Sequence, residues 1–283
     1  MHSIITGNPS AIRDINRSGV LDMIRRHGPI SQSDLATMMN LQRSTILRII
    51  KDLESEGLVK EVGKSASSSK GGRRASLLEL KEDGAFAIGV DFEADSIVAS
   101  LVDILGRHVG FIRNPISAPG TKELVLQSLA DTIEKLLHAF PEHRERIIGI
   151  GVAMPGQVDS ESGLSIYAAN FKDWRNVNIA NYLYGKFQIP VKIEHSLSLM
   201  ALGELWYGEG SPNMICLGFR HGIGLGIVMN GIIYRGGHRF AGEIGHIPVP
   251  GISFRCNCGL TGCLETVASA NGLARQARQA MEE

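Results

Sequence analysis

The chain has 283 residues and equal numbers of basic and acidic side chains, 29 of each, so its formal net charge at neutral pH is zero. This length is sufficient for two or three compact units, and the balanced charge gives no overall attraction to nucleic acid or to a membrane surface. The N-terminus lacks the blocks of a secretion signal, and no apolar run approaches the roughly 20 residues that span a bilayer, so we expect a cytoplasmic protein.

The charge is distributed unevenly along the chain. Residues 1–80 contain 12 Lys and Arg against 8 Asp and Glu, whereas the remainder contains 17 against 21. A basic segment ahead of an acidic one is typical of a nucleic-acid-binding head. The sequence therefore predicts a head over residues 1–80 and a body over residues 81–283.

The head carries the pattern of a helix-turn-helix. Ser31 and Asp34 resemble a capping box, which opens a short helix. A tight turn at Asn40 then leads into a second helix that runs from Arg43 to about Glu56. Two helices joined by so short a turn form a helix-turn-helix.

The second helix of this pair and the segment after it predict contacts with DNA. The exposed start of the helix carries Arg43, Ser44, Thr45 and Arg48. Two strands over residues 58–62 and 75–80 form a wing, and the polar loop between them ends in Arg73 and Arg74, which suit a narrow minor groove. We therefore expect a winged helix-turn-helix. The alternative is a helical interaction module with a solvated basic loop.

The body changes to the pattern of an α/β fold. Apolar residues predict successive strands over residues 87–91, 97–105 and 109–112, a helix over 124–137 and a buried strand over 147–152. Three strands followed by a crossover helix favour a sheet covered by helices.

Four possible metal ligands lie close together near the end of the sequence. His246, Cys256, Cys258 and Cys263 fall within 18 positions. One imidazole and three thiolates form a closed tetrahedral shell for zinc, and the glycines between them allow tight turns. The alternatives are ordinary thiols, or disulfides of a secreted protein.

These segments carry a family resemblance. GEIGH at 242–246 and CNCGLTGCLE at 256–265 resemble the zinc motif of the ROK family of bacterial sugar kinases and repressors, and the resemblance continues through 149–156 and 201–204. It implies an actin/hexokinase-like (RNase H-like) ATPase fold for the body. A winged head is what repressor members carry and kinases usually lack. Family repressors continue beyond this length, so we expect an incomplete second lobe, either abbreviated or part of a longer protein.

The resemblance also identifies departures from the kinase chemistry. Where ROK kinases carry Asp-x-Gly-Gly-Thr for the nucleotide phosphates, this chain has Asp91, then Glu93 and Asp95 in place of a glycine and the threonine. A like-charge contact at about 4 Å costs on the order of 4 kcal/mol before screening, which disfavours a polyanion. Ser196 replaces the aspartate that accepts the sugar proton, and the second phosphate loop is altered at 220–226. We therefore expect no catalytic residue and no enzyme activity.

The sugar-contacting positions are better retained. By resemblance, Glu243, His246, Glu265 and, less closely, Asn170 contact sugar hydroxyls, and His246 uses its other ring nitrogen for zinc. Alternatively, Glu243 and Glu265 only support the zinc site.

The sequence favours a transcriptional regulator, specifically a repressor of carbohydrate metabolism genes that senses a sugar or sugar phosphate. A single head offers few contacts, so we expect a homodimer or higher oligomer on an inverted-repeat DNA operator. The alternatives are an ATP-dependent sugar kinase with an appended head and a dimeric DNA-binding protein whose body has lost its ligand.

Overall fold

The structure is a computed structural model that describes residues 9–64, 74–93, 95–116, 121–169, 171 and 173–282. The described chain divides into two compact units. One unit contains the residues up to Phe86 together with the turn Val102–Arg107, and the other contains Ala87–Leu101 and the residues from His108 onward.

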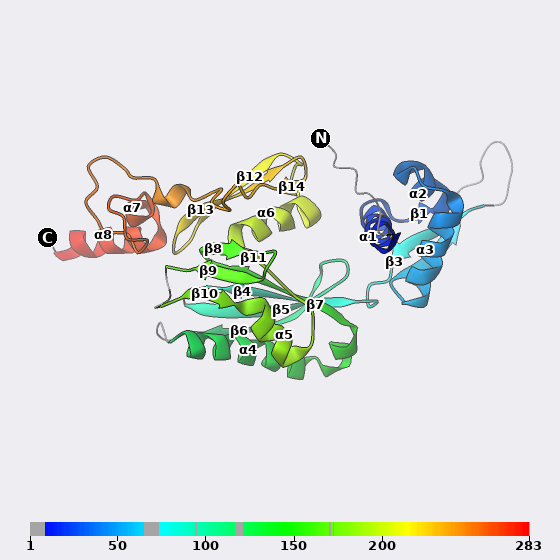
Figure 1. The fold of residues 1–283 in the computed structure, drawn as a ribbon, viewed down its shortest axis with the longest axis horizontal. Coiled ribbons are helices and arrows are strands. Elements are labelled where there is room, and N and C mark those ends of the chain that lie inside the picture. Colours follow the sequence, from blue (N-terminus) through cyan, green and yellow to red (C-terminus); the bar gives the residue numbers. More distant parts are fainter. Residues whose placement is uncertain are drawn as a thin grey trace. The chain divides into compact units, whose positions relative to one another are not determined.

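The first unit is a winged helix-turn-helix, as the sequence predicts (Figure 1). Its sheet has the order β1-β3-β2, with both pairs antiparallel. The elements are α1 (Pro9–His27), β1 (Ile30–Ser31), α2 (Gln32–Met39), α3 (Arg43–Ser55), β2 (Val59–Lys64) and β3 (Ser76–Leu80).

Local sequence explains where α2 begins and ends. The Ser31 hydroxyl accepts a hydrogen bond from the Asp34 backbone N–H at 3.2 Å, which satisfies a donor that the first helical turn leaves free. Asn40 ends the helix in the left-handed region at φ 52°, a conformation that asparagine tolerates better than most residues. The predicted cap and turn are both confirmed.

A continuous apolar core holds this unit together. Leu35 of α2, Ile46 and Leu53 of α3, and Leu78 of β3 are completely buried. The side chains of Ile104 and Leu105, in the turn that belongs to this unit, pack against the same core. The helical stripe that the sequence predicts for α3 is therefore the face that α3 buries.

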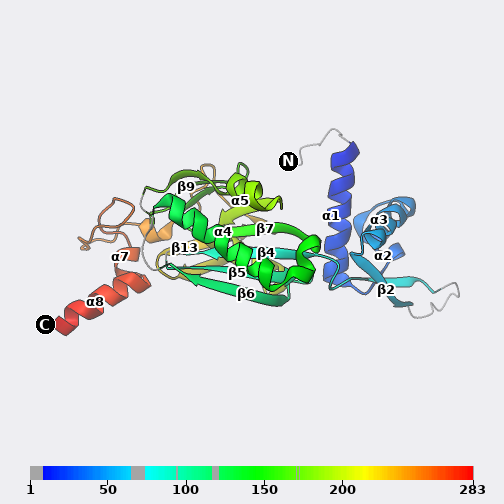
Figure 2. The same cartoon turned by 90° about the horizontal axis from the view of Figure 1, so that it is seen from below.

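The second unit is built on a five-stranded sheet of order β11-β7-β4-β5-β6 (Figure 2). This α/β architecture is the predicted fold class. The elements of this part are β4 (Phe86–Phe92), β5 (Ser96–Asp103), β6 (His108–Pro115), α4 (Lys122–Ala139), a 3-10 turn (Pro141–Arg146), β7 (Ile147–Met154), β8 (Gln157–Asp159), β9 (Leu164–Tyr167), β10 (Arg175–Asn178), α5 (Ile179–Phe187) and β11 (Val191–His195).

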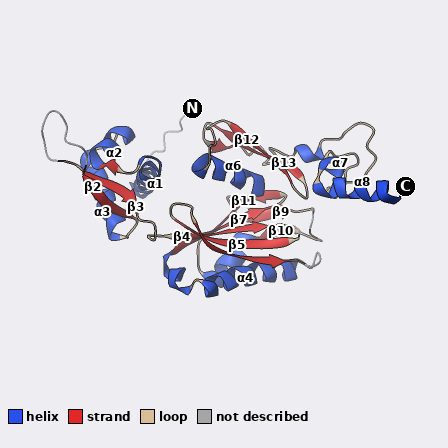
Figure 3. Ribbon diagram, turned by 180° about the vertical axis from the view of Figure 1, so that it is seen from behind, coloured by secondary structure: helices blue, strands red, loops and turns tan. Residues whose placement is uncertain are grey.

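Two three-stranded antiparallel sheets belong to the same unit, one of order β10-β9-β8 and one of order β12-β13-β14. Helices α4 and α5 lie on one side of the five-stranded sheet, and α6 lies between its other side and the β12-β13-β14 sheet (Figures 1 and 3). The remaining elements are α6 (Ser196–Tyr207), β12 (Met214–Phe219), β13 (Ile223–Met229), β14 (Ile232–Ile233), the 3-10 turn η2 (Ile244–His246), α7 (Glu265–Ala268) and α8 (Ala270–Glu282).

Strand pairing brings two predicted site segments to one edge of the larger sheet. β7 and β11 are parallel, and their last residues, Met154 and His195, are register partners. Ligand sites of open α/β sheets form at this carboxyl edge. None of the helices within the described ranges combines the length and apolar character needed to cross a membrane.

Candidate functional site

A cavity of about 490 Å³ opens at the carboxyl edge of the larger sheet. Its walls come from segments that are far apart in the sequence. They include Glu93 after β4, the β11–α6 junction at His195 and Ser196, the loop between β12 and β13 at 220–224, and the predicted sugar contacts Glu243, His246 and Glu265. The volume is large enough for a small polar ligand.

The three predicted sugar contacts that the structure describes converge on one another. The Nε2 atom of His246 lies 3.7 Å from a carboxylate oxygen of Glu243, and its Nδ1 atom lies 3.7 Å from a carboxylate oxygen of Glu265. All three side chains line the cavity. Asn170, the fourth predicted contact, lies outside the described residues.

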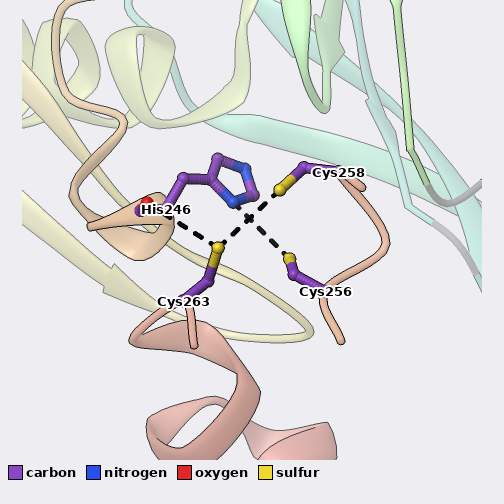
Figure 4. A group of neighbouring side chains, drawn as sticks. All are labelled: His246, Cys256, Cys258 and Cys263. Atoms are coloured by element: carbon purple, nitrogen blue, oxygen red, sulfur yellow. Dashed lines mark hydrogen bonds between the residues drawn. The ribbon is translucent and has the colours of Figure 1, made fainter. Parts of the chain in front are cut away.

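His246 also belongs to a compact cluster with the three predicted cysteines (Figure 4). The four ligand atoms all lie within 4.8 Å of one another. The Sγ atom of Cys256 lies 3.7 Å from Nδ1 of His246, and the Sγ atoms of Cys258 and Cys263 are 3.7 Å apart. A tetrahedral shell with Zn–S bonds of about 2.3 Å places neighbouring sulfurs about 3.8 Å apart. The donor set and its spacing therefore fit zinc.

Burial keeps protons on two of the thiols of the cluster. Burial and the hydrogen bond with Glu265 raise the pKa of the Cys256 thiol, and burial raises that of Cys263. A bound metal would have to displace these protons, because the thiolate is the form that ligates a metal. All four cysteines are free in the structure, so it contains none of the disulfides of the alternative.

Two glycines allow the GEIGH segment to pack against β13. A Cβ atom on Gly242 would lie 2.2 Å from the Leu225 carbonyl oxygen, and Gly242 adopts φ 95°. A Cβ atom on Gly245 would lie 2.2 Å from the Ile223 carbonyl oxygen. Only glycine permits this approach, which holds Glu243 and His246 at the cavity wall.

The two altered phosphate loops are joined by ion pairs. The Nη2 atom of Arg220 lies 3.0 Å from Asp91 and 2.5 Å from Glu93, and Nε2 of His221 lies 3.3 Å from Asp95. Burial raises the pKa of Glu93 despite the attraction of Arg220. Although burial opposes the effect, the hydrogen bond from Ser96 and the nearby His221 lower the pKa of Asp95. The space between these loops contains three carboxylates and their own cationic partners.

Ser196 stands at the position where the related kinases carry their catalytic aspartate. Ser196 begins α6 and lines the cavity, and His195 precedes it at the helix N-cap without a side-chain cap bond. Burial lowers the pKa of His195. Among the described residues that line the cavity, the carboxylates are Glu93, Glu243 and Glu265, and none follows His195 directly.

The predicted DNA contacts lie on the first unit. Arg43, Ser44 and Arg48 are exposed on α3, whereas Thr45 is half-buried. Arg74 is exposed at the start of the wing's second strand segment, and Arg73 lies outside the described residues. The opposite end of α3 is tied to α1 by an ion pair between Arg17 and Glu56.

Comparison with known proteins gives the family. Residues 87–283 match the ROK family, and residues 16–62 match the MarR family. The chain belongs to the ROK family. A xylose repressor of Caldicellulosiruptor bescii is 35% identical over 94% of this chain and 67% of its own length.

Two further ROK relatives distinguish the regulators from the kinases. The crystal structure of a ROK family transcriptional regulator, a homologue of the E. coli MLC protein, is 27% identical with a TM-score of 0.81 and covers 96% of this chain and 68% of its own. A glucokinase of Halalkalibacterium halodurans is 36% identical over only 69% of this chain and 60% of its own length. The chain thus spans about two thirds of the xylose repressor, and the regulators align with nearly all of it.

One feature of this ROK site is absent from the sequence prediction. The sequence shows carboxylates at 93 and 95 and an arginine and a histidine at 220 and 221, but not that they pair. The signal that could have predicted this pairing is the opposite charge of the two loops, since both correspond to the phosphate loops of the related kinases.

Proposed function

We propose that this protein is a DNA-binding transcriptional repressor whose ROK body senses a carbohydrate. The exposed basic start of α3 is the observation that carries the proposal, because Arg43, Ser44 and Arg48 are free of the core and placed as in a recognition helix. Relatives that align with nearly all of the chain include a repressor and a transcriptional regulator, which supports the same function. Because its target is the chromosome, we place the protein in the cytoplasm.

The effector site in this proposal is the cavity beside the metal cluster. Glu243, His246 and Glu265 supply two carboxylates and an imidazole edge, which suit the vicinal hydroxyls of a sugar. The name of the xylose repressor makes D-xylose the first ligand to test. Asn170 is proposed as a further contact on sequence resemblance alone.

Zinc is the proposed metal of the cluster. His246, Cys256, Cys258 and Cys263 would form a closed shell, so the metal would stabilise the loop and orient His246 rather than activate water. Its chemistry here would be structural.

We further propose that the protein is not an enzyme. Arg220 already neutralises carboxylates at the loops that bind phosphates in the related kinases, and Ser196 offers no strong base. A homodimer would place two heads on an inverted repeat and provide enough phosphate contacts for binding at physiological salt.

Fluorescence anisotropy with the DNA upstream of the protein's own gene tests the proposal. We expect salt-sensitive binding to this DNA and a change in affinity on addition of D-xylose, D-glucose or N-acetylglucosamine. Equal binding to this DNA and to a scrambled fragment of the same length, with and without each sugar, would exclude a sugar-responsive repressor of this promoter.

A further inference from the structure

Three arginines lie in the loops that follow β12 and β14. They pair with carboxylates of strands and loops on the other side of α6. Each such pair joins segments that are far apart in the sequence. The pairs are Arg220 with Asp91 and Glu93, Arg235 with Glu194, and Arg239 with Asp159 and Glu161. Of these, only the Arg220 group lies at the cavity wall beside the predicted sugar contacts.

Arg220 contacts both carboxylates at the end of β4. A single nitrogen, Nη2, reaches both Asp91 at 3.0 Å and Glu93 at 2.5 Å. The other carboxylate oxygen of Asp91 is buried and has no hydrogen-bond partner among the described residues. Removal of Arg220 would leave this half-buried carboxylate without the cation that it contacts in the structure.

The backbone of Arg220 is also tied to the sugar-binding side of the cavity. The Arg220 carbonyl accepts a hydrogen bond from the backbone N–H of Ala270 at 3.0 Å, at the start of α8. Two residues on, Gly222 lies against the side chain of Glu265, since a Cβ atom there would approach a Glu265 carboxylate oxygen to 3.0 Å. A displacement of this loop would therefore move or free Glu265.

We propose that Arg220 is a positioning residue of the effector site: by holding the β12–β13 loop against the end of β4, it fixes Gly222 and Glu265 in the geometry that binds a sugar. The inference rests on the proposed function, because it takes Glu265 to be a ligand contact. It requires no nucleotide between the two loops.

The partial exposure of the Arg220 group favours a positioning role over a stabilising one. The side chains of Arg220 and Asp91 are 39% and 37% exposed, and solvent screening leaves such pairs little net contribution to stability. Burial and the neighbouring carboxylates Asp91 and Asp95 raise the pKa of Glu93 although Arg220 lies beside it, which agrees with a weak pair.

Hydrogen exchange of the full zinc-loaded chain tests the idea without any ligand. The variants are Arg220→Gln, Arg220→Lys and the control Arg175→Gln, which removes an exposed arginine of β10 away from the cavity. We expect Arg220→Gln to raise exchange in residues 218–224 and 264–271, Arg220→Lys to restore part of the protection, and Arg175→Gln to match the parent. Unchanged exchange of residues 264–271 in Arg220→Gln would overturn the proposal.

Titration calorimetry with D-xylose provides a second readout. We expect Arg220→Gln to weaken binding about tenfold, and Arg220→Gln with Glu93→Gln to weaken it no further, because contacts in one network are not additive. The double variant also removes one of the two carboxylates that lose their cation, so it keeps the test valid if Arg220→Gln does not fold. Equal affinity of the double variant and the parent would refute a positioning role. If D-xylose does not bind even to the parent protein, the xylose hypothesis fails. The hydrogen-exchange result then decides alone whether Arg220 is a positioning residue.

Discussion

His246 and Glu243 connect the metal cluster to the cavity. The Nε2 atom of His246 lies 3.7 Å from a carboxylate oxygen of Glu243, while Nδ1 of the same ring faces the sulfur of Cys256 at the same distance. One imidazole therefore belongs to both the cluster and the cavity wall. Because a metal fixes the ring of its histidine ligand, loss of the metal should disturb the wall as well as the loop.

The first prediction concerns the metal. Elemental analysis should find about one zinc per chain, and Cys258→Ser should lower both zinc content and melting temperature, because a closed zinc shell contributes directly to folding free energy. Cys216→Ser is the control, since Cys216 is free and lies outside the cluster. A metal-free protein whose melting is unaffected by chelator would show that the cluster is only a packed loop.

The second prediction separates the two interpretations of Glu265. Its carboxylate lies 2.9 Å from the Cys256 sulfur and also lines the cavity. If it binds sugar, Glu265→Gln should weaken D-xylose binding by about 1.5–3 kcal/mol, the usual contribution of a hydrogen bond to a charged group, while zinc content stays unchanged. Calorimetry and metal analysis on the same sample decide the matter. Loss of zinc with unchanged sugar affinity would instead assign Glu265 to the metal site.

Much of the fold could be predicted because its signals are local. The Ser31 cap, the Asn40 turn and the buried stripe of α3 each depend on residues within about one helical turn. The cluster of His246 and three cysteines was also predicted, because its four residues fall within 18 positions and the glycines between them permit tight turns. β1 was not predicted, because two residues carry no periodicity and only the pairing of Ile30 with Leu78 defines the strand.

The ion pairs of the cavity could not be predicted from the sequence. Arg220 and Asp91 are separated by 129 positions, so their contact depends on how α6 holds two sheets together. The sequence shows which side chains are charged, but each basic residue of the body could pair with many of its carboxylates. Sequence reasoning therefore identified the carboxylates of the altered loop but not the arginine that pairs with them.

The third prediction concerns pH. The raised pKa of Glu93 means that the folded protein binds more protons than the unfolded chain between the ordinary carboxyl pKa and the folded value. The free energy of unfolding therefore falls as pH rises through this window, and the loss is complete above the folded pKa. Glu93→Gln should remove this component, so its melting temperature relative to the parent should rise as pH increases above the ordinary carboxyl pKa of 4.5. A constant difference across the series would contradict the assignment. Glu134→Gln, on the exposed face of α4, is the control.

The fourth prediction is that the purified protein does not phosphorylate sugars. Glu93 and Asp95, paired with Arg220 and His221, stand where the kinases carry a phosphate-binding glycine and threonine, and Ser196 cannot accept the hydroxyl proton. D-xylose, D-glucose and N-acetylglucosamine should therefore not increase ATP turnover above a no-enzyme control. Ser196→Asp should not restore turnover, because Arg220 still joins the two loops. Sugar-dependent release of ADP by the parent would instead support a kinase with an appended head.

The fifth prediction is sequence-specific DNA binding by the head. Arg48→Ala should relax discrimination at one base position by roughly 1–3 kcal/mol, because an arginine on a recognition helix contacts base edges. Alanine at both Arg73 and Arg74 should weaken binding to all sequences and reduce the salt slope by up to about two, since wing arginines contact phosphates and the minor groove. Anisotropy across a salt series, on native and scrambled promoter DNA, measures both effects, with Arg175→Ala as the control. If all variants bind like the parent, the head is an interaction module and not a DNA-binding domain.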